Sequence, residues 1–181
     1  MFCIKERKEL PYWQIRKNLA DQLKKSAEQR KVNKTHYLIK KIKNYLLASL
    51  AFNCPVNSWR ISMHKWRGVN IGEGVFIGLH CTLDHAYPEY IYMEDFSGLS
   101  GDNYIVTHSN PAIRFKDVFP SYVAPVILRK GAWLGIKTTI LPDVEIGENA
   151  VVSAGLTINK NVPSKSIVLP NKYKTVSYEQ Y

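Results

Sequence analysis

Histidine is the residue type in this sequence best suited to moving a proton at neutral pH, because an unperturbed imidazole titrates near that pH. The chain has five histidines. His108, in IVTHSNP, follows a stretch of repeated sequence and precedes a segment without repeats, residues 109–125. Position alone does not separate a general base from a structural histidine. For His36 and His64, which lie in a predicted helical region, and for His80, a structural role is the simpler interpretation.

The cysteines do not form a pattern typical of a metal site or a disulfide framework. Cys3, Cys54 and Cys81 are widely spaced, odd in number and include no CxxC pair. Reduced thiols indicate a cytoplasmic protein, and no metal is expected. The N-terminal MFCIKERKEL has no apolar run of the kind found in signal peptides. The longest apolar stretch, residues 45–54, is about half as long as a membrane-spanning helix.

Positive charge is concentrated in the N-terminal third of the chain. Residues 1–60 hold 14 Lys and Arg against four acidic residues, whereas residues 61–181 hold 11 of each. This change in composition predicts a boundary near residue 60. The excess charge has three interpretations: a solvated helical surface, a surface that contacts anionic lipid, or one that meets an acidic substrate. Nucleic acid is not an expected partner, because no known binding motif accompanies the charge.

The basic segment is predicted to form three helices. The first covers residues 11–30, because Pro11 suits a first turn and apolar residues then recur every four positions. The second begins near Asn33 or Thr35 and ends by residue 53, since a proline follows at position 55. Its predicted apolar face consists of Leu38, Ile39, Ile42, Tyr45, Leu46 and Leu50. A short third helix is expected over residues 59–67.

The sequence after residue 68 follows a period of six residues. An aliphatic residue occupies every sixth position at Leu128, Leu134, Ile140, Ile146, Val152 and Ile158. Four residues after each of these comes a second small or apolar residue, namely Ala132, Thr138, Val144, Ala150, Leu156 and Val162. The same period recurs earlier, with interruptions, at Ile71, Ile77, Leu83, Met93, Leu99 and Ile105.

A period of six fits neither a flat strand, whose period is two, nor a helix, whose period is 3.6. One aliphatic position in six predicts a short strand followed by a corner, and stacked turns of this kind form a parallel β-helix with an internal aliphatic core. We therefore expect an all-β domain over residues 68–166, with an external loop at 109–125. Residues 1–67 are expected to form a basic α-helical extension and residues 167–181 a C-terminal tail. An ordinary antiparallel β-domain is the alternative.

The repeated region resembles the hexapeptide-repeat acetyltransferases, specifically the branch that O-acetylates galactosides, maltose and capsular sugars. The resemblance covers residues 55–176 and is most specific at PVILRKGAWLGIKTTILPDVEIGENAVVSAGLTINKNVP, residues 125–163. A second matching stretch is GVNIGEGVFIGLHCTLD, residues 68–84. The resemblance implies a left-handed β-helix, a homotrimer, and acetyl-CoA bound as co-substrate in a groove between neighbouring subunits.

The resemblance also assigns roles to residues near the interruption of the repeat. His108 occupies the place of the family's catalytic histidine, which takes a proton from the acceptor while the thioester is attacked. Asp84, in CTLD, matches an acidic or amide position that helps to place the acceptor. His85 follows it directly and is a further candidate for the acceptor pocket.

The external loop is where acceptor choice is expected to be determined. Its residues Arg114 and Tyr122 are candidates for facing a saccharide, because aromatic rings stack on sugar faces. Asp117 in the same loop is a candidate for orienting His108, although the spacing does not establish this contact.

A further set of residues matches the cofactor-binding positions of the family. These residues are Trp133, Ile136, Ala154, Gly155, Asn159, Lys160 and Lys172. Small residues allow an extended ligand to approach the backbone, and a lysine supplies a point charge for a phosphate. Asn159 replaces a commoner Thr, and the segment VLPNKYK that carries Lys172 lacks the family's glycine.

The leading hypothesis is acetyl-CoA-dependent O-acetylation of a saccharide hydroxyl by a cytoplasmic enzyme, with surface-polysaccharide assembly as its setting. One alternative is N-acetylation of an amino sugar or a xenobiotic. Another is a non-catalytic β-helix that acts as a scaffold. The basic helices have two interpretations in this context: they dock on anionic lipid at the inner face of a membrane, or they cap the end of the β-helix.

Overall fold

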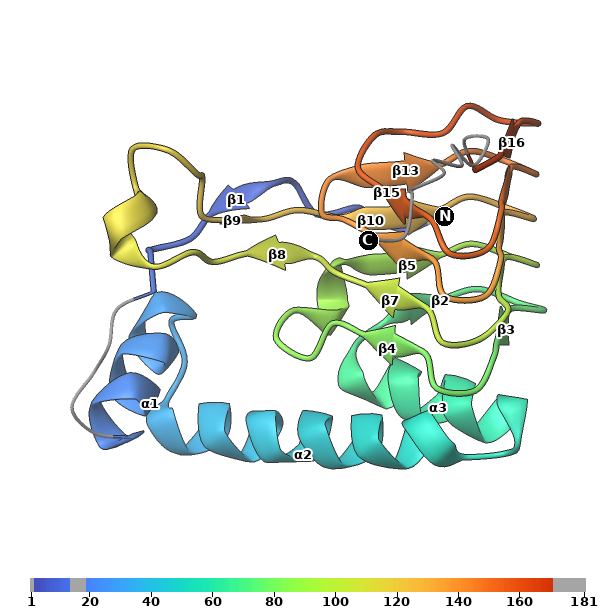
Figure 1. The fold of residues 1–181 in the computed structure, drawn as a ribbon. Helices are drawn as coiled ribbons and strands as arrows, with labels where there is room; N and C mark the ends of the chain where they lie inside the picture. Colours follow the sequence, from blue (N-terminus) through green and yellow to red (C-terminus); the bar gives the residue numbers. More distant parts are fainter. Residues whose placement is uncertain (1, 14–18, 171–181) are drawn as a thin grey trace, which may run out of the picture.

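The computed structural model describes residues 2–13 and 19–170 of the protein. It consists of a helical region, a solenoid of short strands and an arm that projects from the solenoid (Figure 1). The helices are α1 (Leu19–Gln29), α2 (Lys34–Asn53) and α3 (Asn57–Arg67). They precede the solenoid in the sequence and lie along one end of it (Figure 1).

Three parallel sheets form the faces of the solenoid. Sheet 1 joins β2 (Asn70–Ile71), β5 (Ile91–Met93), β10 (Val126–Leu128) and β13 (Val144–Ile146). Sheet 2 joins β3 (Phe76–Ile77), β6 (Gly98–Leu99), β11 (Trp133–Leu134), β14 (Val151–Val152) and β16 (Ile167–Val168). Sheet 3 joins β4 (Thr82–Leu83), β7 (Tyr104–Ile105), β12 (Thr139–Ile140) and β15 (Thr157–Ile158).

Each coil of the repeat takes three units of six residues. Val126 pairs with Val144 in the next coil, and Leu134 pairs with Val152, so both pairs are eighteen residues apart. Because the strands are parallel and in register, residues one coil apart lie side by side along the solenoid. The period of six therefore produces the three-sided parallel β-helix that the sequence predicts.

The aliphatic positions of the repeat form the core of the solenoid, as predicted. They make one buried ladder in each sheet: Ile71, Met93, Leu128 and Ile146 in sheet 1, Ile77, Leu99, Leu134 and Val152 in sheet 2, and Leu83, Ile105, Ile140 and Ile158 in sheet 3. Stacking of the coils removes this apolar surface from water, which favours folding by roughly 25 cal/mol per Å². The corner positions of the second series are buried or partly buried as well.

An arm leaves the solenoid after β7. Its strands β8 (His108–Ser109) and β9 (Tyr122–Val123) pair antiparallel, and β1 (Lys8–Glu9) from the N-terminal segment adds a third strand beside β9. The 3-10 turn η2 (Ile113–Phe115) lies in the connection between β8 and β9, at the tip of the arm (Figure 1). The predicted external loop thus contains β structure, and its first strand starts at His108.

The first predicted helix begins later than expected. The sequence predicted a helix over residues 11–30, but α1 starts at Leu19, and residues 14–18 lie outside the described part of the chain. Trp13 donates its backbone N–H to the carbonyl of Pro111 in the arm. The arm therefore supplies a backbone partner to an extended segment, and this tertiary contact overrides the local helical pattern.

The predicted apolar face of α2 is not the face that the protein buries. The helix packs along α3 and buries Asn44, Ala48 and Ala51. Small alanine side chains allow close approach of neighbouring elements, so this face becomes the inner one. The residues of the predicted face that remain exposed are Ile39, Ile42, Tyr45, Leu46 and Leu50.

Helix α3 covers the edge of the first coil with buried arginines. Arg60 donates from Nε to the carbonyl of Ile77 at 2.7 Å. Arg67 donates from Nη2 to the carbonyls of Leu83 at 3.0 Å and Asp84 at 2.8 Å. The first coil has no preceding coil to pair with, so these guanidinium groups satisfy acceptors at the sheet edge. The helical region therefore caps the solenoid.

The solenoid continues slightly past the boundary expected at its C-terminal end. β16 pairs with β14 in sheet 2, so the segment 167–181, expected to be a tail, begins with a strand of the solenoid. Residues 171–181 lie outside the described part of the chain.

Candidate active site

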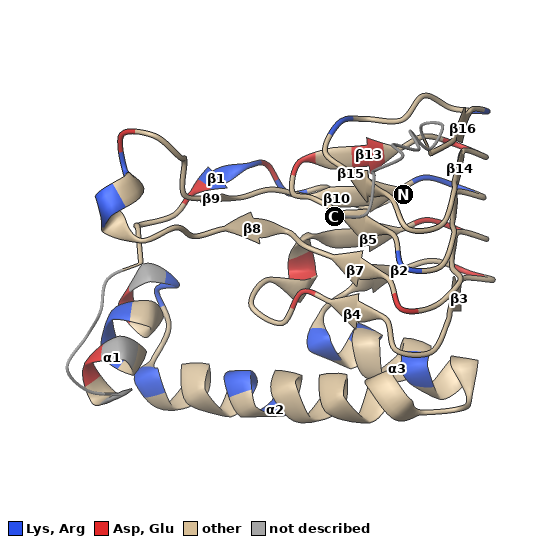
Figure 2. Ribbon diagram, viewed as in Figure 1, with Lys and Arg blue, Asp and Glu red and all other residues tan. Residues whose placement is uncertain are grey.

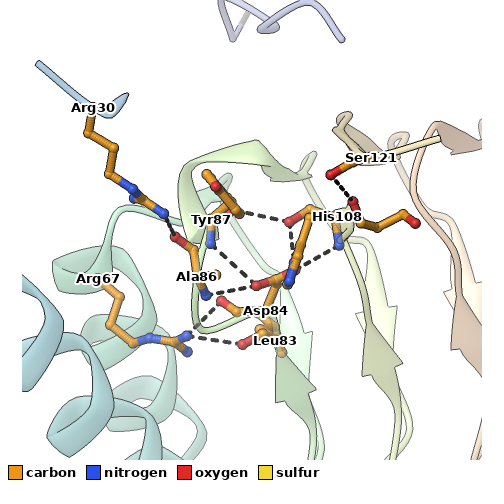
Figure 3. Close-up of polar contacts among 10 residues, drawn as sticks. Arg30, Arg67, Leu83, Asp84, Ala86, Tyr87, His108 and Ser121 are labelled. Carbon is orange, nitrogen blue, oxygen red and sulfur yellow. Dashed lines mark hydrogen bonds and ion pairs between the residues drawn. The ribbon is translucent and has the colours of Figure 1, made fainter. Parts of the chain in front are cut away.

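The centre of the candidate site is a hydrogen bond between His108 and Asp84. Leu83 of β4 pairs with Ile105 of β7, so the residues that follow these two strands leave the same end of sheet 3. The Nδ1 atom of His108 lies 2.6 Å from Oδ2 of Asp84 (Figure 3). An ionised carboxylate only accepts hydrogen bonds, so Nδ1 carries the proton and donates it.

The carboxylate of Asp84 is buried and accepts four further hydrogen bonds. Oδ2 accepts from the backbone N–H of Thr107 at 2.9 Å and from its hydroxyl at 2.8 Å. Oδ1 accepts from the backbone N–H groups of Ala86 at 2.8 Å and Tyr87 at 3.3 Å. Burial by itself would raise the pKa of Asp84, but the contacts with His108 and Thr107 outweigh it and lower that pKa well below its ordinary value. Asp84 is therefore ionised at neutral pH.

The geometry suits His108 to act as a base through its second ring nitrogen. With the proton held on Nδ1, Nε2 keeps the lone pair that can accept a proton. The side chain of His108 is 31% exposed, whereas that of Asp84 is 3% exposed. An acceptor can therefore approach the imidazole, while the carboxylate stays enclosed and stabilises the positive charge that forms on the ring.

The helical region holds the loop that carries Asp84 in place. The ring of Tyr87 lies beside the imidazole, with ring centroids 5.4 Å apart. Arg30, directly after α1, lies 4.3 Å from the centre of the Tyr87 ring and donates to the carbonyl of Ala86 at 2.9 Å. Arg67 of α3 also approaches the loop from the helical region and donates to the carbonyl of Asp84 (Figure 3). Two arginines of the N-terminal extension thus fix the loop of residues 84–87.

The structure places Asp84 directly against the candidate base. Asp84, expected to help place the acceptor, has an enclosed carboxylate that contacts His108. This contact with the imidazole is of the kind for which Asp117 was a candidate. His85 is exposed and lines hollows on the α2 side of the loop, together with Asn44 in one of them.

The side chains of the two acceptor candidates of the arm each contact another side chain of the protein. Arg114 lies in η2 at the tip, and its guanidinium stacks on the ring of Phe115 at 4.8 Å. Tyr122 pairs with Ser109 in the arm, and the guanidinium of Arg7 lies 3.8 Å from the centre of its ring. Both side chains are therefore engaged with the arm or the N-terminal segment.

Three of the predicted cofactor residues meet at the corner between sheets 2 and 3. Gly155 donates its backbone N–H to the carbonyl of Ile136 at 2.9 Å, which joins this corner in two adjacent coils. Ala154 and Gly155 are exposed, and a Cβ built on Gly155 would meet no atom within 4 Å. This open stretch of backbone fits an extended ligand such as a pantetheine arm.

Trp133 lies on the outer face of sheet 2, in a row of exposed apolar side chains. Its ring covers Gly98 and stacks on Phe76, with centroids 6.0 Å apart and an interplanar angle of 16°. Strand pairing continues the row to Val151 and Ile167. The row is exposed in the single chain, so it is available to a ligand or to a second copy.

The remaining cofactor candidates lie at the other end of the sheet 3 strands. Asn159 and Lys160 follow β15 and line a shallow groove, just as His108 follows β7. Ile136 and Gly155 precede β12 and β15 instead. One chain thus holds the two groups of predicted cofactor residues at opposite ends of the same strands. Lys172 lies outside the described residues.

Sequence reasoning missed several residues that build this site. Thr107 was visible only as the neighbour of His108, and Tyr87, Arg30 and Arg67 had no signal, because their contacts arise from packing between distant segments. Among the described residues, no group of three or more His, Cys, Asp or Glu side chains is arranged to hold a metal ion.

Comparison with protein families and curated proteins agrees with the repeat. Residues 125–160 match the bacterial transferase hexapeptide family (six repeats). A putative acetyltransferase of Bacillus subtilis, YvoF, is 27% identical over 151 residues, covering 80% of this chain and 81% of the relative. A galactoside O-acetyltransferase of Lactococcus lactis is 23% identical over 67% of this chain, which corresponds to 58% of that enzyme.

Solved structures share the fold. A hexapeptide-repeat acetyltransferase from Vibrio cholerae, solved with acetyl coenzyme A, superposes with a TM-score of 0.60 at 16% identity, covering 73% of this chain and 82% of that one. A maltose O-acetyltransferase from Clostridium difficile gives a TM-score of 0.57 at 17% identity, covering 80% and 88%. Residues 125–160 therefore match a hexapeptide transferase family, and the solenoid as a whole has the fold of solved hexapeptide-repeat acetyltransferases.

Proposed function

We propose that the protein transfers an acetyl group from acetyl-CoA to a hydroxyl group of a saccharide, with His108 as the general base. The observation that carries this proposal is the 2.6 Å hydrogen bond from His108 Nδ1 to the enclosed Asp84 carboxylate, which leaves Nε2 as the proton acceptor. A saccharide hydroxyl is the proposed acceptor because the relatives include galactoside and maltose O-acetyltransferases.

The protein's own groups supply the proton transfers of this reaction. Acetyl-CoA supplies the acetyl group as a thioester, whose carbonyl carbon the acceptor oxygen attacks. Nε2 of His108 takes the hydroxyl proton as the new C–O bond forms, and Asp84 stabilises the resulting imidazolium. The imidazolium then returns this proton to the sulfur as the C–S bond breaks. Base catalysis of this kind contributes typically ~10²–10⁴-fold to the rate.

The active form is proposed to be a homotrimer of left-handed β-helices. The two groups of predicted cofactor residues lie at opposite ends of the sheet 3 strands in one chain. A neighbouring copy would bring the His108 end of one chain to the Gly155 corner of the next. The exposed apolar row that contains Trp133 and Val151 supports such a contact, because single chains rarely leave continuous apolar surface in water. Size measurement in solution tests the trimer.

The experiment that tests the function is an acetyl-transfer assay with full-length protein, acetyl-CoA and panels of saccharides and amino sugars. Release of CoA and mass spectrometry of the product would identify the acceptor atom. We expect transfer to a hydroxyl, and a loss of about 100-fold or more in His108→Ala. His80→Ala is the matched control, because His80 forms an exposed pair with Asp102 at 3.5 Å.

Two other results would favour the alternatives. Transfer confined to amines would replace O-acetylation with N-acetylation. Absence of acetyl-CoA binding and of turnover with every acceptor would favour a non-catalytic scaffold. Unchanged activity in His108→Ala would place the base elsewhere.

The exposed face of the helical region is proposed to contact an anionic membrane. Its exposed apolar residues, together called the α2–α3 face, are Ile39, Ile42, Leu46, Leu50, Trp59 and Trp66, each 50–66% exposed. Lys43 donates from Nζ to the carbonyl of Trp66 at 2.9 Å, which joins the two helices beside this face. Aliphatic and tryptophan side chains bordered by lysines are the composition of helices that lie in a membrane interface.

Charge favours an anionic bilayer over a second copy of the same face. No acidic residue occurs between Glu28 and Glu73, and α2 and α3 carry only basic charges (Figure 2). Two such faces would repel each other, whereas an anionic lipid surface attracts them. Among the described helices, none combines the length and apolarity needed to cross a bilayer. The proposed location is therefore the cytoplasmic surface of a membrane, where surface polysaccharides are assembled.

A further inference from the structure

A hollow lined by basic and aromatic side chains lies between the helical region and the loop that follows β4. It consists of two adjoining parts that share Arg30, Tyr37 and Lys40. One part reaches the N-terminal segment, and the other reaches α2 and His85. We call the two parts together the basic pocket. Neither acceptor candidate of the arm, Arg114 or Tyr122, lines the described pocket, whereas the third acceptor candidate, His85, does.

The basic pocket borders the catalytic histidine. Tyr87 lines it, and the Tyr87 ring lies 5.4 Å from the His108 ring, measured between centroids. Val123 also lines it and is the strand partner of His108 in the arm. A molecule bound in the pocket is therefore adjacent to the residue that would remove its proton.

Positive charge dominates the lining of the part that reaches the N-terminal segment. Its charged residues, apart from His36, are Lys5, Lys8, Arg30, Lys31 and Lys40 against Glu9 and Glu89, which is an excess of three positive charges. Glu89 lies 4.0 Å from Arg30 and offsets part of that charge. The pocket has fewer carboxylates than basic side chains, so its electrostatic field favours a negatively charged ligand.

The second part of the pocket offers a hydrogen-bond acceptor and aromatic surface. The Asn44 side chain lines it, and this residue is 5% exposed. Within the described chain, the Oδ1 atom of Asn44 has no hydrogen-bond partner. A buried acceptor without a partner is costly, and a sugar hydroxyl would supply the missing donor. The ring of Tyr37, which lines both parts, provides a flat apolar surface of the kind on which sugars stack, and Tyr87 lines the other part.

We infer that the basic pocket binds an acceptor saccharide that carries a negatively charged group, either a phosphate or a carboxylate. The charged group would lie among Arg30, Lys31 and Lys40, and a sugar hydroxyl would donate to Asn44. This inference rests on the proposed function, because it names the chemical class of the acceptor. It also gives a role to the basic N-terminal extension, whose residues form most of the pocket.

Direct binding tests the inference without requiring turnover. Glucose and galactose, their 1-phosphates and the corresponding uronates are titrated into full-length protein and measured by calorimetry. We expect at least one charged form to bind about 10-fold more tightly than its neutral sugar, since two charge-assisted contacts are added. The advantage should shrink when ionic strength rises from about 50 to about 300 mM, because salt screens exposed charges. Comparison of 1-phosphates with uronates identifies the charged group.

Charge-neutral variants locate the site. In Lys31→Gln/Lys40→Gln, the advantage of the charged sugar should disappear, while binding of the neutral sugar stays the same. Both lysines are exposed, so the fold should tolerate the change. The matched control is Lys24→Gln/Lys25→Gln, which removes the same charge from exposed positions of α1 that do not line the basic pocket.

The results separate this inference from the proposed function. Equal binding of neutral and charged sugars, or an advantage that survives in Lys31→Gln/Lys40→Gln, would overturn the inference even if neutral sugars are acetylated. Tight, lysine-dependent binding without any acetyl transfer would instead uphold the pocket and overturn the proposed function. An advantage lost equally in both double variants would reflect the overall charge of the chain and would also overturn the inference.

Discussion

Nδ1 of His108 lies 2.6 Å from Oδ2 of Asp84, although the two residues belong to different coils of the solenoid. Parallel pairing of β4 with β7 brings them together, and the arginines of the helical region hold the loop between them. The site thus depends on the solenoid and the extension at once. Five predictions follow from this arrangement and from the surfaces around it.

Replacing Asp84 by Asn should reduce kcat by about 100-fold or more while leaving the KM for acetyl-CoA unchanged. An amide cannot stabilise the imidazolium, and its NH₂ group favours the opposite tautomer of His108. Steady-state kinetics with near-UV circular dichroism as a check on folding would measure this. Asp102→Asn is the matched control, because Asp102 faces His80 in an exposed pair. Equal losses in both variants would contradict a positioning role for Asp84.

The Asp84 carboxylate should also contribute to acid stability. The pKa of Asp84 in the folded protein is lower than its ordinary value. The contribution of this carboxylate to the free energy of unfolding is therefore fully present above about pH 4 and is lost as the pH falls towards the folded pKa. Urea denaturation of wild type and Asp84→Asn should therefore differ more at neutral pH than near about pH 3. If the difference in stability between wild type and Asp84→Asn does not change with pH, packing alone would account for the stability lost in the variant.

Acidification should destabilise the protein through His64 as well. Burial, followed by the charges of Arg67, His85 and Arg60, lowers the pKa of His64 to about 3 from 6.5. Between these pH values the unfolded chain binds one proton more than the folded chain at this position. The free energy of unfolding should therefore fall by up to ~1.4 kcal/mol per pH unit below pH 6.5.

Urea denaturation over a pH series measures how steeply the free energy of unfolding changes with pH. His64→Gln should make this dependence less steep. His64 Nδ1 lies 2.9 Å from Nη1 of Arg67, and a Gln oxygen can accept from the same donor. His36→Gln serves as the control, since His36 is exposed. If His64→Gln keeps the full slope, the protonation of His64 is not what couples stability to pH.

Removing charge from the groove after β15 should weaken acetyl-CoA binding. Lys160→Gln is expected to raise the KM for acetyl-CoA by about 3- to 10-fold with little change in kcat, because a phosphate contact made equally in ground and transition states affects binding alone. Lys165→Gln is the matched control, because Lys165 is a comparable exposed lysine in a neighbouring turn. The same KM in both variants would remove Lys160 from the proposed cofactor site.

The α2–α3 face should bind vesicles that contain phosphatidylglycerol and not vesicles of phosphatidylcholine alone. Leu46→Glu/Leu50→Glu should abolish flotation with the anionic vesicles, because charged side chains oppose insertion of an apolar face. Val118→Glu is the control at an exposed apolar position in the arm. Flotation that persists in the double variant, or a change of oligomeric state instead of lipid binding, would contradict membrane contact.

The repeat made the solenoid predictable, because every sixth position must fill the same internal ladder. Leu128, Leu134 and Ile140 are buried in three different sheets for that reason. The helical region was less predictable. α2 carries an apolar row that would ordinarily be buried, yet its alanine face packs inward. Helical periodicity identifies an amphipathic helix but not the surface that covers it.

The sequence by itself determined the coil and its core, since both depend on residues at short, regular spacing, and a resemblance to known acetyltransferases marked His108 as the candidate base. Only the tertiary structure decided the hydrogen bond between Asp84 and His108, the contacts of Arg30 and Arg67 with the loop of residues 84–87, and the basic pocket. These contacts join side chains from separate coils and helices. Their geometry depends on how the extension packs on the solenoid, and no local pattern in the sequence encodes that packing.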